Sequence, residues 1–219
     1  MKKILFTLAV VCFSFGFATA QSTTGHIKYK IDMSSDNPEV EMQLAMFSGS
    51  TLDISFDGKK SSSTMSMGAM MSIKTITSED EEVLMLWSGM VGNKAVRTSV
   101  EEMKDGEKEK KTDMDVEFVK GSKTVAGYKC KKAISKTEEG DEVVFWYTEK
   151  LQMGAPGQGN LNGKIPGIAL AFESFNSNMI MSFEAIEVED TIEDDSIFNM
   201  EIPEGYEEMS YDDMKSMGM

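Results

Sequence analysis

Methionine is the residue type that points most directly to chemistry, because it accounts for 20 of the 219 residues. The densest group contains Met65, Met67, Met70 and Met71. Closely spaced thioethers are soft ligands that suit Cu(I), but methionine also fills apolar cores and lines adaptable apolar surfaces. In one extended strand Met70 and Met71 would point to opposite faces, so the four sulfurs converge only at a bulge or turn. We therefore favour packing or an apolar cavity, and keep a copper-binding protein as the alternative.

Other catalytic and metal-binding arrangements find little support in the sequence. His26 is the only histidine, and neither an H-E-x-x-H motif nor a G-x-S-x-G motif accompanies it. The acidic run at 187–195 lacks the glycine and the spacing of an EF-hand calcium loop. We therefore predict a protein that is not an enzyme and carries no cofactor.

Cysteine usage excludes an intramolecular disulfide after removal of the N-terminal leader described next. Cys12 lies in that leader, which leaves Cys130 alone. The stretch around Cys130 alternates like a strand and predicts a half-buried thiol that behaves as a small hydrophobe. The alternatives are an intermolecular bridge or a reactive thiol, whose pKa the flanking Lys129 and Lys131 would lower if the side chain were exposed.

The first twenty residues have the layout of a secretory signal peptide. Two lysines precede an almost uncharged apolar run at 4–17, and a small-residue cleavage signal, Ala-Thr-Ala, occupies 18–20. Bulky residues before Cys12 argue against the alternative of a lipoprotein acylated there. We expect the mature protein, residues 21–219, to work outside the cytoplasm.

Net charge limits the partners of the mature chain. The leader contains two of the lysines, so 20 Lys and Arg residues remain against 37 Asp and Glu residues, a formal net charge of −17 compared with −15 for the whole chain. Such a surface repels phosphate backbones and anionic head groups, which disfavours nucleic-acid binding and electrostatic membrane docking. No segment after the leader is long and apolar enough for a transmembrane helix. The 199 mature residues suffice for a single domain with a substantial core.

Hydrophobic alternation predicts a mostly antiparallel sheet whose strands are separated by turn residues. The expected strands lie at 25–33, in short pieces between 51 and 97, at 128–135, at 142–147 and at 179–188. One short amphipathic helix is expected at 38–47, a solvated loop or hairpin tip at 101–115, and a flexible tail or frayed helix from about 207. The predicted fold class is therefore α+β, with one or two short helices.

Four short stretches resemble known secreted proteins. Residues 163–169, Gly-Lys-Ile-Pro-Gly-Ile-Ala, are similar to the signature of the GLPGLI proteins, secreted Gram-negative proteins of unknown function. The strand at 125–133 and the stretches at 143–148 and 202–206 look like parts of the related DUF4412-type domains. Lys164 aligns with the opening Gly of the signature and Ala169 with its closing Ile, so it stays open which of the two groups is closer.

The resemblance implies a LolA-like fold, similar to that of the periplasmic lipoprotein carriers. In that fold a curved antiparallel sheet forms an incomplete barrel, and one or two short helices cover its concave face. The resemblance also implies the periplasm of a Gram-negative bacterium, or secretion beyond it, and it supplies no catalytic residue. From the residues themselves, Pro166-Gly167 is expected to break a strand or turn a corner, because proline lacks a ladder donor and glycine permits unusual backbone angles.

The leading hypothesis is burial of an apolar ligand on the concave face, such as a lipid, an acyl chain or a lipidated peptide of a lipoprotein. The helix at 38–47 or the loop at 154–163 would gate it. The expected cavity residues are large and apolar: Leu44, Phe47, Trp146, Leu170, Phe172, Met179, Met181 and Phe183. The alternatives are a closed core at the same place, the copper-binding protein, and an interaction module of the cell envelope with no small ligand.

Overall fold

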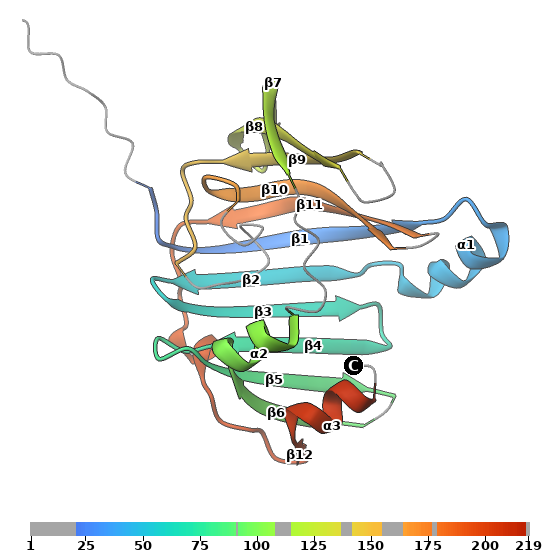
Figure 1. The fold of residues 1–219 in the computed structure, drawn as a ribbon, viewed down its shortest axis with the longest axis vertical. Helices are drawn as coiled ribbons and strands as arrows, with labels where there is room; N and C mark the ends of the chain where they lie inside the picture. The colour runs from blue at the N-terminus through green and yellow to red at the C-terminus, as the bar shows by residue number, and fades with distance from the viewer. Residues whose placement is uncertain are drawn as a thin grey trace, which may run out of the picture.

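In the computed structural model the described residues are 21–90, 92–107, 115–136, 142–154, 164–176 and 179–217. They contain twelve strands that form one open sheet (Figure 1). The strand order is β12-β6-β5-β4-β3-β2-β1-β11-β10-β9-β8-β7, and every neighbouring pair is antiparallel except β12 with β6.

The strands and helices follow one another along the chain in this order. Their bounds are β1 (Thr24–Ser34), α1 (Pro38–Leu44), η1 (Ala45–Phe47), β2 (Thr51–Asp57), β3 (Lys60–Met67), β4 (Met71–Thr77), β5 (Glu82–Gly89), β6 (Lys94–Ser99), α2 (Val100–Glu107), β7 (Val116–Val125), β8 (Tyr128–Lys136), β9 (Glu142–Thr148), β10 (Ile168–Asn176), β11 (Met179–Glu189), η4 (Asp195–Phe198), β12 (Glu207–Met209) and α3 (Tyr211–Ser216).

Strand β1 lies in the middle of the sheet and connects two meanders. It pairs on one side with β2 and on the other with β11, the last long strand. Strands β2 to β6 follow each other as neighbours on the first side, and β11 back to β7 do so on the second. The mostly antiparallel α+β fold predicted from the sequence is therefore confirmed.

The sheet curves strongly at its β7 end. Lys123 Nζ on β7 lies 3.2 Å from Glu184 Oε1 on β11, although β10, β9 and β8 separate these strands in the sheet order. In a flat sheet the two strands would be about 19 Å apart. Pairing irregularities between Ala169 and Ala171 of β10 and between Val119 and Ser122 of β7 accompany this curvature, since bulges bend strands and increase their twist.

The helix predicted at 38–47 exists but does not cover the sheet. The Asn37 side chain accepts a hydrogen bond from the Glu39 amide, and Pro38 occupies the first turn, so α1 begins as expected. It continues as the single turn η1 and lies beyond the strand ends (Figure 1). The helices on the sheet face are α2 and α3.

Two segments are more ordered than the sequence suggested. Helix α2 begins at Val100, where a solvated loop was expected at 101–115, and residues 108–114 of that stretch lie outside the described residues. In place of a flexible tail from 207, β12 extends the sheet beside β6 and α3 buries Met214. The loop prediction was wrong for 101–107, whereas α3 agrees with the alternative of a terminal helix. Both segments gave a weak signal because very few apolar side chains, such as Val100 and Met214, anchor each highly charged segment.

Residues 1–20, where the sequence predicts a signal peptide, lie outside the described residues. Within the described ranges, none of the helices has the length and apolar character needed to cross a membrane. The leader and the extracytoplasmic location therefore stay predictions.

The corner expected at Pro166-Gly167 is present. Strand β10 begins at Ile168, directly after Gly167, whose φ is +125°. A Cβ at Gly167 would lie 2.0 Å from the Thr148 carbonyl oxygen at the end of β9. Only glycine fits this backbone angle and this close approach between strands.

We expect Gly167→Ala to lower the free energy of unfolding by more than about 2 kcal/mol, because the strained φ and the contact with Thr148 add together. Gly205→Ala is the matched control. Its φ is +84° but nothing lies within 4 Å of the added Cβ, so the cost should stay near 1–2 kcal/mol. Urea denaturation of both variants measures the difference, and equal losses would show that the close approach to Thr148 does not matter.

Candidate functional site: an apolar face of the sheet

One face of the sheet is apolar across six neighbouring strands. Directly paired residues of antiparallel strands point to the same face. The registers align one residue from each strand in a continuous row: Trp87, Ile73, Met65, Leu52, Tyr29 and Ala185. Helices α2 and α3 pack on this face, because Val100 and Met214 belong to the same buried cluster as Trp87 (Figure 1). We name it the helix-covered face.

Two apolar clusters share the helix-covered face. The larger surrounds Tyr29, and the smaller surrounds Trp87 beneath α2 and α3. Met65 packs against the larger cluster and Ile73 against the smaller, and these two residues are direct partners in the β3–β4 pairing. We name the boundary between the clusters the seam. It consists of half-buried side chains that share this face: Met65, Met67, Met71, Ile73 and Thr75.

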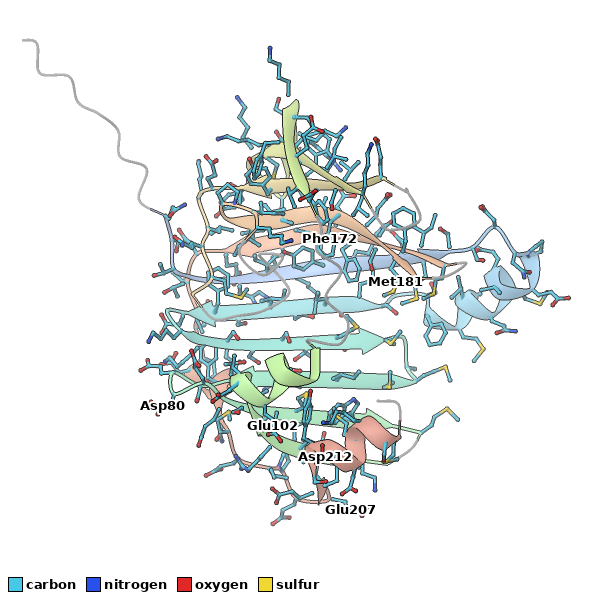
Figure 2. The ribbon with its side chains drawn as sticks, viewed as in Figure 1. Asp80, Glu102, Phe172, Met181, Glu207 and Asp212 are labelled. Carbon is cyan, nitrogen blue, oxygen red and sulfur yellow. The ribbon has the colours of Figure 1, made fainter. Side chains whose placement is uncertain are left out.

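An aromatic group adjoins the larger cluster and centres on Phe172 (Figure 2). The ring of Phe172 stacks on Phe183 with centroids 4.6 Å apart, and meets Tyr29 edge-on at 6.1 Å. Phe145 lies 6.3 Å away in a near-parallel orientation. Each such contact contributes about 0.5–1.5 kcal/mol beyond burial. Phe172 remains only half-buried, so the group keeps part of its apolar surface open.

Five of the eight predicted cavity residues come together here. Leu170 and Phe183 are buried within the larger cluster, and Trp146, Phe172 and Met181 pack against it. These five residues are therefore neighbours in the fold. The inner members form closed core, and the outer members are half-buried.

The other three predicted residues are not among the described members of this cluster. Leu44 is buried in α1, Phe47 is half-buried in η1, and Met179 is the half-buried first residue of β11. The expected helical gate is placed differently, because α1 lies beyond the strand ends (Figure 1). The other expected gate, the loop at 154–163, lies outside the described residues except for Gly154 and stays a prediction.

Tyr29 ties the centre of the sheet to β10. Its side chain is fully buried, and its hydroxyl donates a hydrogen bond of 2.8 Å to the Ala169 carbonyl, beyond the intervening strand β11. Burial raises the pKa of Tyr29 well above its usual range, so the side chain stays neutral and keeps its proton for this bond.

We expect Tyr29→Phe to lower the free energy of unfolding by about 1–3 kcal/mol, because it leaves the Ala169 carbonyl buried without its partner. Tyr128→Phe is the control, since Tyr128 is half-buried and its hydroxyl has no hydrogen-bond partner among the described residues. Chemical denaturation compares the two variants. A loss no larger than that of Tyr128→Phe would remove the structural role given to this bond.

Cys130 is enclosed in the larger cluster. Its side chain is completely buried, and its Sγ lies 3.5 Å from the Tyr128 carbonyl oxygen. Burial raises the pKa of the thiol, against smaller lowering influences from the Val125 backbone and Lys123. The structure thus favours the small-hydrophobe interpretation, with deeper burial than expected, over a reactive thiol.

Native protein should therefore react with a thiol reagent such as DTNB on the order of 100-fold more slowly than the same protein in urea, since reaction requires local opening and a thiolate. The urea-unfolded mature chain, which contains Cys130 alone, is the control for the intrinsic reactivity of this thiol. A native reaction as fast as the unfolded one would place Cys130 at an accessible surface.

The opposite face of the central strands is polar. His26 Nδ1 lies 2.9 Å from Ser55 Oγ, and His26 Nε2 lies 3.6 Å from Asp53 Oδ1, which Lys28 also approaches at 3.7 Å. Ser, His and Asp are the residue types of a serine-hydrolase triad, in which Nε2 faces the serine and Nδ1 faces the aspartate. Here Nδ1 faces Ser55 and Nε2 faces Asp53. Ser55 is also buried within a regular strand rather than exposed at a sharp turn. Lys74 lies on the same face, where desolvation lowers its pKa. Within the described ranges, no group of three His, Cys, Asp or Glu residues is placed to hold a metal ion.

Comparison with known proteins adds little to this geometry. No protein-family model and no curated protein matches the chain. Two solved structures of PNGF-II are similar to it. The C2 crystal form is 15% identical with a TM-score of 0.48, and the alignment covers 89% of this chain and 32% of PNGF-II. The P21 form is 14% identical with a TM-score of 0.49, over 89% and 33%. The chain thus spans about a third of the length of PNGF-II, and we draw no argument from similarity at this level. The GLPGLI resemblance stays a prediction from sequence.

Proposed function

We propose that this protein is a non-enzymatic, extracytoplasmic protein that binds an apolar ligand, such as a lipid, an acyl chain or a lipidated peptide, along the seam. The observation that carries the proposal is the seam itself, where Met65 and Ile73 leave half-buried apolar surface between two closed clusters. The composition of the leader supports the location.

The side chains of the seam suit a flexible apolar guest. Methionine has three rotatable side-chain bonds and a polarizable sulfur, so Met65, Met67 and Met71 can adapt to a chain of variable shape. Each methylene buried there would contribute roughly 0.8 kcal/mol, so roughly eight methylenes would supply roughly 6 kcal/mol before the costs of binding. A polar ligand would gain little from the same surface.

Helices α2 and α3 are the described elements placed to admit a ligand. Both helices lie over the strands beside the seam. Val100 anchors α2 to the sheet as a buried residue, and Met214 does the same for α3. Helices of eight and six residues held in this way can shift without unfolding the sheet. In this proposal they replace the gates expected at 38–47 and 154–163.

An interaction module without a small ligand is the second candidate. Met42 in α1, Met46 in η1 and Met90 after β5 are 76%, 58% and 83% exposed. Exposed large apolar side chains are enriched at protein interaction sites. This candidate predicts a protein partner and no bound lipid.

Titration with a fluorescent fatty acid tests the proposal, using Met65→Gln and Thr64→Gln. The two residues are adjacent in β3 and both half-buried, but their side chains lie on opposite faces. An unpaired amide in an apolar site costs about 1–3 kcal/mol, so Met65→Gln should weaken binding roughly tenfold or more, and Thr64→Gln should leave it unchanged.

Native mass spectrometry of protein purified from the envelope gives the second readout. A bound acyl species removed by lipid extraction supports the proposal. No acyl species together with no probe binding would overturn it in favour of the interaction module, and equal effects of the two Gln variants would remove the seam as the site.

A further inference from the structure

The β3–β4 hairpin brings together three methionines that one extended strand would keep apart. Met67 and Met71 are direct cross-strand partners, and Met65 precedes Met67 by two residues on the same face. Cβ atoms of such partners are about 4.5–5.5 Å apart, and diagonal neighbours about 7–8 Å, within reach of long side chains. Three thioether sulfurs can therefore converge on one point above the helix-covered face. Met70 lies in the turn, where its amide donates to the Met67 carbonyl.

We propose that Met65, Met67 and Met71 form a binding site for one Cu(I) ion. This inference does not rest on apolar-ligand binding, although the three methionines also belong to the seam. The metal-binding alternative of the sequence named four residues, and the structure selects three of them because the turn at 68–70 opposes Met71 to Met67.

The turn that sets this geometry is held from both sides. The Gly68 amide donates to Ser50 Oγ at 3.1 Å, and Ser50 in turn donates to the Phe47 carbonyl at 2.6 Å. Gly68 has a φ of +56°, and a Cβ there would lie 2.8 Å from the Met46 carbonyl oxygen of η1. On the other side, Gly89 approaches the Met70 carbonyl so closely that a Cβ would lie 2.6 Å from it. The ligand-bearing ends of β3 and β4 are thereby fixed before any ion arrives.

The surroundings favour a soft monovalent ion. The residues paired with the three methionines from neighbouring strands are uncharged: Leu52, Ile73 and Gly89. Among these described partners there is no carboxylate, and neutral thioethers alone compensate a divalent cation poorly. Soft thioether donors select Cu(I), whereas Ca²⁺ and Mg²⁺ require oxygen ligands. The three methionines are half-buried rather than enclosed.

Competition with the chromophoric chelator bathocuproine disulfonate under reducing, oxygen-free conditions tests the site on the full mature chain. We expect one Cu(I) per chain, and at least tenfold weaker binding when Met65, Met67 and Met71 are all changed to Leu. Leucine keeps the apolar volume and removes the sulfur, so the fold should persist. The control changes three half-buried methionines elsewhere, Met103, Met200 and Met209, to Leu and should bind as wild type.

Methionine methyl NMR locates the ion. With ¹³C-labelled methyl groups, addition of Cu(I) should shift the resonances of Met65, Met67 and Met71 and leave those of Met103, Met200 and Met209 in place. If the triple variant loses its cooperative unfolding transition, the single variant Met71→Leu replaces it in the competition assay. This variant must still weaken Cu(I) binding several-fold. The proposal is overturned if the wild-type protein does not compete with the chelator for Cu(I), or if the Leu variant binds Cu(I) as tightly as the wild type. In either case the fatty-acid assay still tests apolar binding separately.

Discussion

The pairing of β1 with β11 is the constraint on which the rest of the structure depends. It joins two meanders that would otherwise be separate sheets, each with an open edge. Its register also places Ile31 beside Phe183 and Met33 beside Met181, so side chains from both ends of the chain meet in one apolar cluster. The Tyr29 hydroxyl extends this connection one strand further, to β10.

Register decides which chemistry each face can carry. Side chains alternate along a strand, so a slip of one residue between β3 and β4 would exchange the half-buried apolar seam for Ser72 and Lys74 on the opposite face. The fixed turn at Gly68 prevents that slip. The same register therefore underlies the apolar surface proposed to take a ligand and the thioether group proposed to take an ion. The two proposals share a cause but require different atoms, methyl and methylene groups in one and sulfur in the other.

Local patterns predicted most of the strands but not β7, β10 or β12, and they gave no information on contacts between distant segments. Alternation placed strands at 25–33 and 179–188, and β1 and β11 cover Thr24–Ser34 and Met179–Glu189. Neither stretch predicts that β1 and β11 pair with each other, because pairing between strands far apart in the sequence leaves no local pattern. From the sequence, the methionines could converge only at a bulge or turn, and the structure has a turn at 68–70, but a local pattern could not show which residues that turn sets opposite each other. Helix α2 was missed because Val100 and Met103, its contacts with the core, are too few to produce a periodic signal among charged residues.

The central position of β1 also sets the order in which this chain can complete its fold. β1 is synthesised first among the strands, but its partner β11 follows about 150 residues later. The β1–β6 meander can form from local hairpins in the meantime, with the inner edge of β1 unpaired and its backbone donors and acceptors open. An edge of this kind can recruit another strand, from a second copy or from a misplaced hairpin. During synthesis from the N-terminus, the chain therefore exposes this unpaired edge of β1 until the second meander has formed. Truncation before residue 179 removes β11 and leaves the edge exposed permanently.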